Sequence, residues 1–203
     1  MDVACDGPLW PDCGSGDGLP LSSTQAHSGV KSGYIDGGGV IDGVLLLGNK
    51  TSGNWYLEFW AYVPMDKMGY FNVQAGYPVI PSWCGEIYLD RDGTTNGNGE
   101  VIGQYETTFS FPKNEWFLIK MHWYITNGLP NATWGMTVDN VNVVPPGIPY
   151  LDTNGATPAG LGALDFFSAS NQCEFYADDF GYDDQPLPFT GGTTWKAMSM
   201  VNQ

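Results

Sequence analysis

Residues 45–74 read LLLGNKTSGNWYLEFWAYVPMDKMGYFNVQ and contain two runs of alternating side chains. In the first run, residues 54–63, apolar side chains occupy every second position. Between them lie Tyr56, Glu58, Trp60 and Tyr62. A period of two, bounded here by Gly53 and Pro64, is typical of a β-strand. A second alternating run follows at residues 70–74, so we expect an antiparallel hairpin with one apolar face and one face of aromatic and polar side chains.

The whole chain has the composition of an all-β domain. Its 203 residues fit one domain of sandwich size. The 28 Gly and 14 Pro residues favour many short strands joined by tight turns. Alternation recurs at residues 83–90 and 115–126, and residues 173–182 look like a terminal strand. We therefore predict a two-sheet antiparallel β-sandwich of the jelly-roll type.

The turn-forming residues also indicate how the domain is bounded. We expect the sandwich to occupy residues 28–185, preceded by a disulfide-closed loop at 1–27 and followed by a tail or linker at 186–203. Residues 145–163 are rich in Pro, Gly and Asn, so we expect a long loop there.

The chain is strongly acidic. Seven Lys and Arg residues stand against 22 Asp and Glu residues, which gives a formal net charge of -15. A polyanion would be repelled at long range, so we exclude nucleic acid as a partner. Solubility in an extracellular setting explains most of these carboxylates, and metal ligation is the alternative for some of them.

Membrane-spanning and export segments have recognisable sequence patterns. No apolar run reaches the roughly 18 residues of a membrane-spanning helix. The first residues lack a basic segment followed by an apolar one, which a signal peptide would have. We expect no membrane span, and we expect the chain to be a piece of a longer secreted or cell-surface protein.

Four cysteines, an even number, lack the close spacing of a zinc site. Disulfides are the better interpretation, and they imply an oxidising compartment. Cys5 and Cys13 bracket a short turn-rich segment, whereas Cys84 and Cys173 both lie at the edges of expected strands. We predict the pairs Cys5–Cys13 and Cys84–Cys173.

Two acidic segments are candidates for calcium. Asp178 or Asp179, together with Asp36 or Asp42, could form a structural site that ties the first and last strands, and the alternative is a pair of solvated acids. The segment 90–100, DRDGTTNGNGE, offers oxygen ligands at alternate positions. It departs from the EF-hand pattern, so a hairpin loop is the alternative that we favour there.

Several strands share the division into an apolar face and an aromatic and polar face. If they lie side by side, their polar faces merge into one surface. It would consist of Glu58, Trp60, Tyr62, Asn72, Gln74, Glu86, Tyr88, Lys120, His122 and Tyr124. Aromatic planes pack on the C–H faces of sugars, while carboxylates, amides and His fix the hydroxyl groups. The pattern therefore indicates binding of a polysaccharide or glycoconjugate, and an outer layer of packing is the alternative.

Catalysis on the same surface is a further alternative. Glu58 and Glu86 would be the paired carboxylates of a glycoside hydrolase if they faced each other. Lys120, His122 and Tyr124 share one strand face, as a polysaccharide lyase would require for charge neutralisation and proton transfer. A histidine whose hydrogen bonds are satisfied within the sheet is the interpretation of His122 that we favour over catalysis.

Four segments carry a resemblance to a known class of modules. They are residues 45–74 quoted above, WCGEIYLDRDG at 83–93, FPKNEWFLIKMHWYI at 111–125 and EFYADDFGYD at 174–183. Together they resemble the concanavalin A-like or LamG-like jelly-roll modules of secreted multidomain proteins of Bacteroidetes. The last segment also looks like the final strand of jelly-roll carbohydrate-binding modules. The resemblance covers Ser28 to Asp183.

This resemblance implies two antiparallel sheets and an extracellular location beside other domains of the same secreted protein. It favours glycan binding or surface adhesion over catalysis. Such folds host many functions, so a glycan-cleaving enzyme and a structural module of an extracellular filament stay as alternatives.

Overall fold

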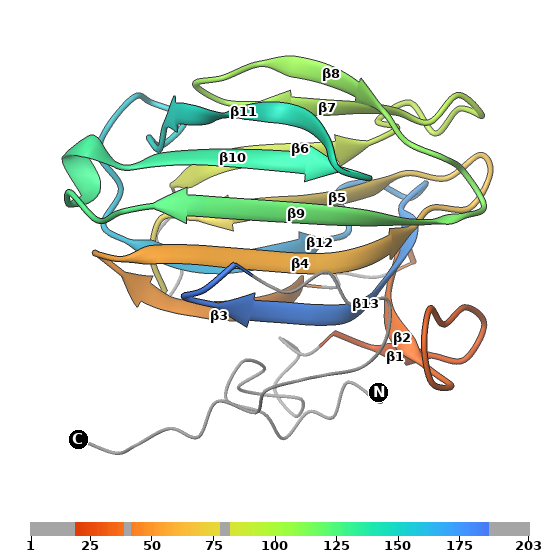
Figure 1. The fold of residues 1–203 in the computed structure, drawn as a ribbon. Helices are drawn as coiled ribbons and strands as arrows, with labels where there is room; N and C mark the ends of the chain where they lie inside the picture. Colours follow the sequence, from red (N-terminus) through yellow and green to blue (C-terminus); the bar gives the residue numbers. More distant parts are fainter. Residues whose placement is uncertain (1–18, 39–41, 78–81, 187–203) are drawn as a thin grey trace.

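The computed structural model describes residues 19–38, 42–77 and 82–186, which form two antiparallel sheets packed face to face (Figure 1). Sheet A consists, in spatial order, of β1 (Leu21–Ser22), β2 (Ser32–Asp36), β13 (Glu174–Asp183), β4 (Asn54–Tyr62), β9 (Trp116–Tyr124), β10 (Thr133–Val138) and β11 (Val141–Pro149). Sheet B consists of β3 (Asp42–Lys50), β12 (Leu161–Phe167), β5 (Gly69–Gln74), β6 (Trp83–Leu89), β7 (Asn98–Ile102) and β8 (Thr107–Ser110). The predicted β-sandwich is confirmed.

The core forms where the apolar sides of the two sheets meet. Phe59 of β4 contacts Phe71 of β5 and Phe166 of β12, with ring centroids 5.4 and 5.5 Å apart. All three side chains are fully buried. The apolar positions of the opening stretch therefore face inward in both strands, as their alternation predicts.

The expected hairpin between β4 and β5 does not form. β4 pairs with β9 and β13 in sheet A, whereas β5 pairs with β6 and β12 in sheet B. Residues 63–68 thus carry the chain from one sheet to the other. Alternation identifies the side of a strand that faces the core, but it does not identify the strand's partner. As a consequence, the outer faces of β4 and β5 point in opposite directions.

Two further boundaries differ from expectation. β1 lies within residues 1–27, which were expected to be a loop, and pairs with β2. Residues 145–163, also expected to be a loop, contain the end of β11 and the start of β12. β11 is the edge strand of sheet A, where prolines are tolerated because one side of the backbone needs no partner.

Residues 90–97 of the segment 90–100 form the β6–β7 hairpin loop, and residues 98–100 begin β7, which confirms the favoured alternative. The carboxylate of Asp90 accepts hydrogen bonds from Thr94 Oγ1 at 2.8 Å and from Lys113 Nζ at 2.9 Å. Lys113 Nζ also donates to the carbonyl of Lys67. The side chains of Asp90 and Lys113 are each only 3% exposed. The lysine ammonium therefore occupies the position beside Asp90 that a bound cation would take.

The predicted Cys84–Cys173 disulfide is wrong, because both cysteines are free and buried. Cys84 lies near the start of β6, which pairs with the end of β5 at Gln74. Cys173 forms a bridge with Met68, just before β5 begins. The length of β5 thus separates the two cysteines by roughly 17 Å, whereas a disulfide needs Cα atoms within about 7 Å. Cys5 and Cys13 lie outside the described residues.

Both buried thiols are expected to be unreactive in the folded protein. Burial raises the pKa of Cys84 and of Cys173 to about 12, so the nucleophilic thiolate is scarce at neutral pH. In a variant carrying Cys5→Ser and Cys13→Ser, native protein should take up no maleimide, and denatured protein should take up one per remaining cysteine. Intact-mass spectrometry measures both. Labelling that needs a reductant after denaturation would contradict the free thiols.

Within the described part of the chain, no helix has the length and hydrophobicity needed to cross a membrane. The one helical element described there is η1, a short 3-10 turn at Leu129–Asn131 between β9 and β10.

Candidate functional site

The ten predicted binding residues fall on two opposite faces of the sandwich. The outer face of sheet A carries Glu58, Trp60, Tyr62, Lys120, His122 and Tyr124. The outer face of sheet B carries Asn72, Gln74, Glu86 and Tyr88. The prediction of one merged surface is therefore wrong, because β4 and β9 belong to one sheet and β5 and β6 to the other.

Because the predicted residues lie on two opposite faces, Glu58 and Glu86 cannot form the carboxylate pair expected for a hydrolase. Glu58 and Glu86 project outward from opposite sheets. Packed sheets are about 10 Å apart before either side chain is added, and paired glycosidase carboxylates lie within about 5–9.5 Å of each other. Glu58 and Glu86 cannot act on the same bond.

At the centre of the sheet A face, Glu58 lies opposite Lys120 in the β4–β9 pair. Lys120 Nζ is 3.9 Å from Glu58 Oε2, and the two side chains are 26% and 20% exposed. Burial raises the pKa of the Glu58 carboxyl, and the Lys120 charge offsets this only in part. The centre of the face is therefore a partly screened ion pair with oxygen and nitrogen atoms near the surface.

Aromatic rings lie at one end of this face. Tyr56 is opposite His122, and Tyr124 follows on β9. The Tyr124 ring is 5.0 Å from the His122 ring and 6.4 Å from the Tyr56 ring, measured between centroids. Tyr124 is 37% exposed and so presents its ring to solvent.

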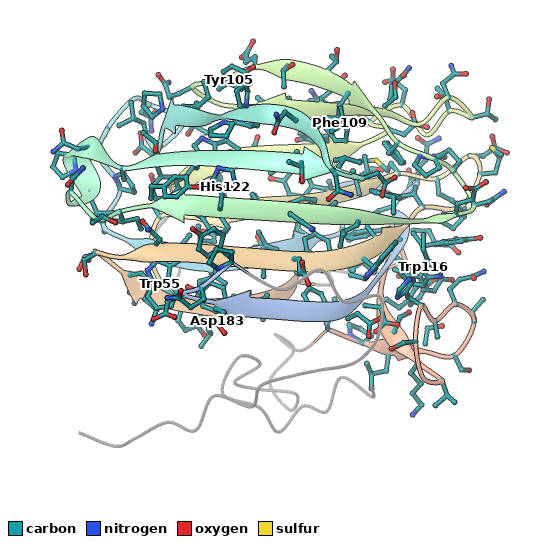
Figure 2. The ribbon with its side chains drawn as sticks, viewed as in Figure 1. Trp55, Tyr105, Phe109, Trp116, His122 and Asp183 are labelled. Atoms are coloured by element: carbon teal, nitrogen blue, oxygen red, sulfur yellow. The ribbon has the colours of Figure 1, made fainter. Side chains whose placement is uncertain are left out.

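A second aromatic group lies at the other end, as Figure 2 shows for Trp116. The Trp116 ring is 5.4 Å from the Tyr62 ring. The imidazole of His27 stacks on Trp60 with centroids 4.0 Å apart and planes at 14°. Trp116 and Tyr62 are partly exposed, so this end also offers ring faces or edges to a ligand.

Tyr56, Trp116 and His27 belong to this face but were absent from the surface predicted from the sequence. Tyr56 and Trp116 share the alternation of Glu58 and Lys120, so the signal that predicted the others could have included them. His27 had no such signal, because it lies in a loop and reaches Trp60 only through the fold.

The His122 ring lies over Gly135 of the neighbouring strand β10, which has no side chain to displace it. His122 Nε2 is buried and has no hydrogen-bond partner among the described residues, so this is not the satisfied sheet histidine of the simpler alternative. Burial lowers the pKa of His122, so the ring is neutral at pH 7. Because Nε2 is shielded from solvent, the face presents the ring itself, and a proton-transfer role for Nε2 loses support.

The sheet B face contains a buried polar network around Asn72 and Gln74. Asn72 Nδ2 donates to Asp165 at 2.8 Å, and Gln74 Nε2 donates to Asn72 Oδ1 at 2.8 Å. Asn72 and Gln74 are each only 2% exposed. These amides hold one another in place and do not face solvent. Asp165 was missed from the sequence because it comes from β12, far along the chain.

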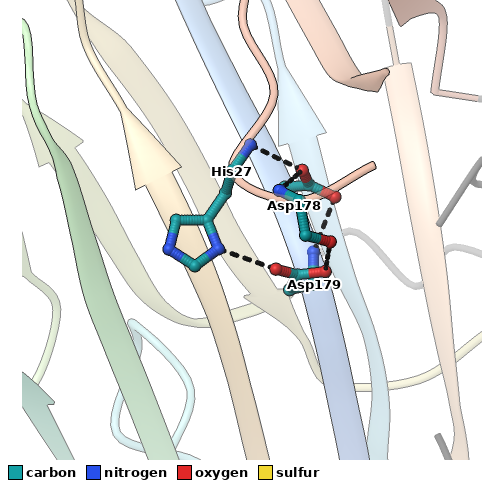
Figure 3. Close-up of polar contacts among 4 residues, drawn as sticks. His27, Asp178 and Asp179 are labelled. Carbon is teal, nitrogen blue, oxygen red and sulfur yellow. Dashed lines mark hydrogen bonds and ion pairs between the residues drawn. The ribbon is translucent and has the colours of Figure 1, made fainter. Parts of the chain in front are cut away.

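The three described aspartates of the calcium hypothesis, Asp36, Asp178 and Asp179, do not converge. Asp178 Oδ2 accepts the backbone N–H groups of His27 and Ser28, at 2.9 and 3.2 Å (Figure 3). His27 Nδ1 lies 2.7 Å from Asp179 Oδ2, and Ser28 Oγ donates to Asp179 Oδ1 at 2.5 Å. The expected tie between an N-terminal segment and the last strand therefore exists, and it is made directly by protein groups.

The other two aspartates lie elsewhere. Asp36 of β2 lies opposite Glu174 of β13. Glu174 precedes Asp178 by four residues on that strand, so Asp36 is about 13 Å from Asp178 along the strand direction. The Asp42 side chain lies outside the described residues. Among the residues that the structure describes, no group of three or more His, Cys, Asp or Glu side chains could hold a metal ion. Calcium binding stays a prediction from the sequence.

Neither a protein-family model nor a curated protein sequence matches the chain. Among solved structures, the chain is similar to the catalytic domain of a glycoside hydrolase family 131 protein from Coprinopsis cinerea, with a TM-score of 0.49, 14% identity, and 84% of this chain and 78% of that chain covered. It is also similar to a galectin from Caenorhabditis elegans, with a TM-score of 0.44, 8% identity, and coverage of 74% and 95%. A third similar structure is a tetrameric galectin from the ball sponge Cinachyrella sp. Its TM-score is 0.44 and its sequence identity is 12%, and the match covers 70% of this chain and 98% of that chain. These values show similarity without assigning the chain to a family.

Proposed function

We propose that the outer face of sheet A binds a glycan without cleaving it, as an adhesion or binding module of a larger extracellular protein of the LamG-like type. One observation carries the proposal. Partly exposed aromatic rings lie at both ends of a single sheet face, and the Glu58–Lys120 pair lies between them. Aromatic rings stack on the apolar faces of sugars. A carboxylate accepts hydrogen bonds from sugar hydroxyl groups, and an ammonium donates hydrogen bonds to them.

The accessibility of the two faces supports this choice. On sheet A, Tyr56, Tyr62 and Trp116 are partly exposed, and Tyr124 is exposed. On sheet B, the amides of Asn72 and Gln74 are buried and engaged with each other. A glycan can therefore reach the sheet A rings without displacing an existing network.

Binding should depend on the exposed rings at both ends of the sheet A face. Trp116→Ala and Tyr124→Ala should each weaken binding on a glycan array about tenfold, because loss of a stacked ring costs about 1–1.5 kcal/mol. The matched control is Tyr88→Ala, which removes a partly exposed ring from sheet B. Binding that survives both sheet A changes and disappears with Tyr88→Ala would move the site to sheet B. No binding by the unaltered protein would favour a structural module.

Glycan cleavage on the same face is the second candidate, and one observation favours it. Asp183 lies opposite Tyr56 in the β13–β4 pair, so it is a diagonal neighbour of Glu58. Diagonal neighbours lie about 7–8 Å apart along the backbone, which allows their carboxyl groups the separation of about 6.5–9.5 Å that inverting glycosidases use. Burial raises the pKa of the Glu58 carboxyl, the direction that a general acid requires. Release of reducing ends from the bound glycans, lost with Glu58→Gln, would establish cleavage. Binding without product supports the proposal above.

A further inference from the structure

We infer that the ligand of the sheet A face is an uncharged, extended glycan chain, and not a uronate-rich or sulfated one. This inference rests on the function proposed above and adds the chemical class of the ligand. It follows from where the few cations of the chain are placed and from the spacing of the aromatic rings.

Most cations of the described residues interact with other groups of the protein. Of the seven Lys and Arg residues in the sequence, six are described. Five of them have partners: Lys50 over the Trp55 ring at 4.2 Å, Lys67 with Glu174 at 2.9 Å, Arg91 with Glu100 at 3.9 Å, Lys113 with Asp90 at 2.9 Å, and Lys120 with Glu58 at 3.9 Å. The sixth, Lys31, is exposed in the turn before β2. These residues do not form the cluster of cations that a polyanion requires.

The surroundings of the sheet A face are acidic. Lys120 is the cation on the face itself, and Glu58 beside it offsets its charge. Asp178 and Asp179 border the Trp60 end, and Asp183 lies beside Tyr56 at the other end. The formal net charge of -15 adds a long-range repulsion of anions. A sugar carboxylate or sulfate would therefore be repelled, whereas hydroxyl groups can bind the ion pair at the centre.

The spacing of the rings sets the length of the ligand. Trp116 and Tyr124 are eight residues apart on β9, which places them about 27 Å apart along the strand. A single sugar cannot contact rings at both ends. A chain that lies along β4 and β9 can contact Tyr62 and Trp116 at one end, Tyr56 and Tyr124 at the other, and the ion pair between them.

Charge can be tested with probes that share one backbone. A soluble neutral β-glucan, and the same β-glucan with its primary alcohols oxidised to carboxylates, would be compared by biolayer interferometry at low salt. A neutral galactomannan, alginate and dextran sulfate would extend the comparison. We expect binding to a neutral probe. Where the β-glucan is bound, we expect at least tenfold weaker binding of its oxidised form, partly restored by salt that screens the repulsion.

The outcomes separate this inference from the function on which it rests. Tighter binding of alginate, dextran sulfate or oxidised β-glucan than of any neutral probe would overturn the neutral class and leave glycan binding standing. Absence of binding to every probe would overturn both. Oligosaccharides of increasing length from a bound neutral probe test the extended ligand: affinity should rise with length and then level off, and equal affinity for the monosaccharide would overturn that part.

Discussion

Replacement of Lys113 by methionine should destabilise the fold by about 3–5 kcal/mol, because it leaves the buried Asp90 carboxylate without its charge partner. The Asp90 and Lys113 side chains are almost fully buried, and Lys113 also binds the carbonyl of Lys67. The ion pair thus joins the β6–β7 loop to the segment before β9. Urea denaturation followed by tryptophan fluorescence measures the free energy of unfolding.

The matched control is Lys67→Met. Its partner Glu174 is 2.9 Å away, but the two side chains are 39% and 26% exposed. Solvent screens such a pair, so we expect a loss below about 1 kcal/mol. Equal losses for the two variants would show that burial does not strengthen the Lys113–Asp90 interaction.

The same pair predicts how stability changes in acid. Burial alone would raise the pKa of Asp90, but hydrogen bonds from Lys113 and Thr94 outweigh it and lower the pKa below its ordinary value. A lowered pKa stabilises the fold above the unfolded value, about 3.9. This stabilisation disappears as the pH falls through the folded value. In Lys113→Met the acid-dependent loss should be smaller.

Phe59→Ala should cost about 3–5 kcal/mol, because it opens a cavity between the two sheets. The Phe59 ring is fully buried and stacks on Phe180 at 5.3 Å, in addition to its edge contacts with Phe71 and Phe166. Those partners come from both sheets, so collapse around the cavity would require both to move. Thermal and urea denaturation both measure the loss.

Two control variants are expected to lose less stability than Phe59→Ala. Val141→Ala, at a side chain that is 68% exposed on the edge strand β11, should change stability by at most about 0.5 kcal/mol. Phe59→Leu keeps most of the buried volume and should cost much less than Phe59→Ala. A loss with Phe59→Ala no larger than that of Val141→Ala would mean that the sheets do not pack through Phe59.

The stability variants and the binding variants act on different parts of the molecule. Lys113 and Phe59 are buried, and Trp116 and Tyr124 present their rings on the outer face of sheet A. Well below the melting temperature, Phe59→Ala should therefore keep glycan binding, whereas Tyr124→Ala should weaken binding about tenfold and keep stability. Opposite effects of the two variants on stability and on binding would show that the exposed rings act in binding and not in packing.

The sequence by itself determined the strands that alternate clearly, such as β4 and β9, and the side of each that faces the core. The alternation correctly predicts that Phe59 of β4 and Ile119 of β9 are buried, but Leu118, on the predicted polar side of β9, is buried as well. This was possible because a strand turns successive side chains to opposite sides, so the pattern is local and needs no knowledge of neighbours. The same pattern predicted that Glu58, Lys120 and Tyr124 point away from the core, and they share one face.

Only the tertiary structure decided which strands lie together. A period of two is identical for a strand in either sheet, so it could not show that β4 and β5 separate and take Glu58 and Glu86 to opposite sides. Partners far apart in the chain decided the rest: Lys113 reaches Asp90, and His27 covers Trp60 because Asp178 and Asp179 hold its loop. Such contacts form only when the sheets pack. They join residues far apart in the sequence, so a local pattern of side chains cannot predict them.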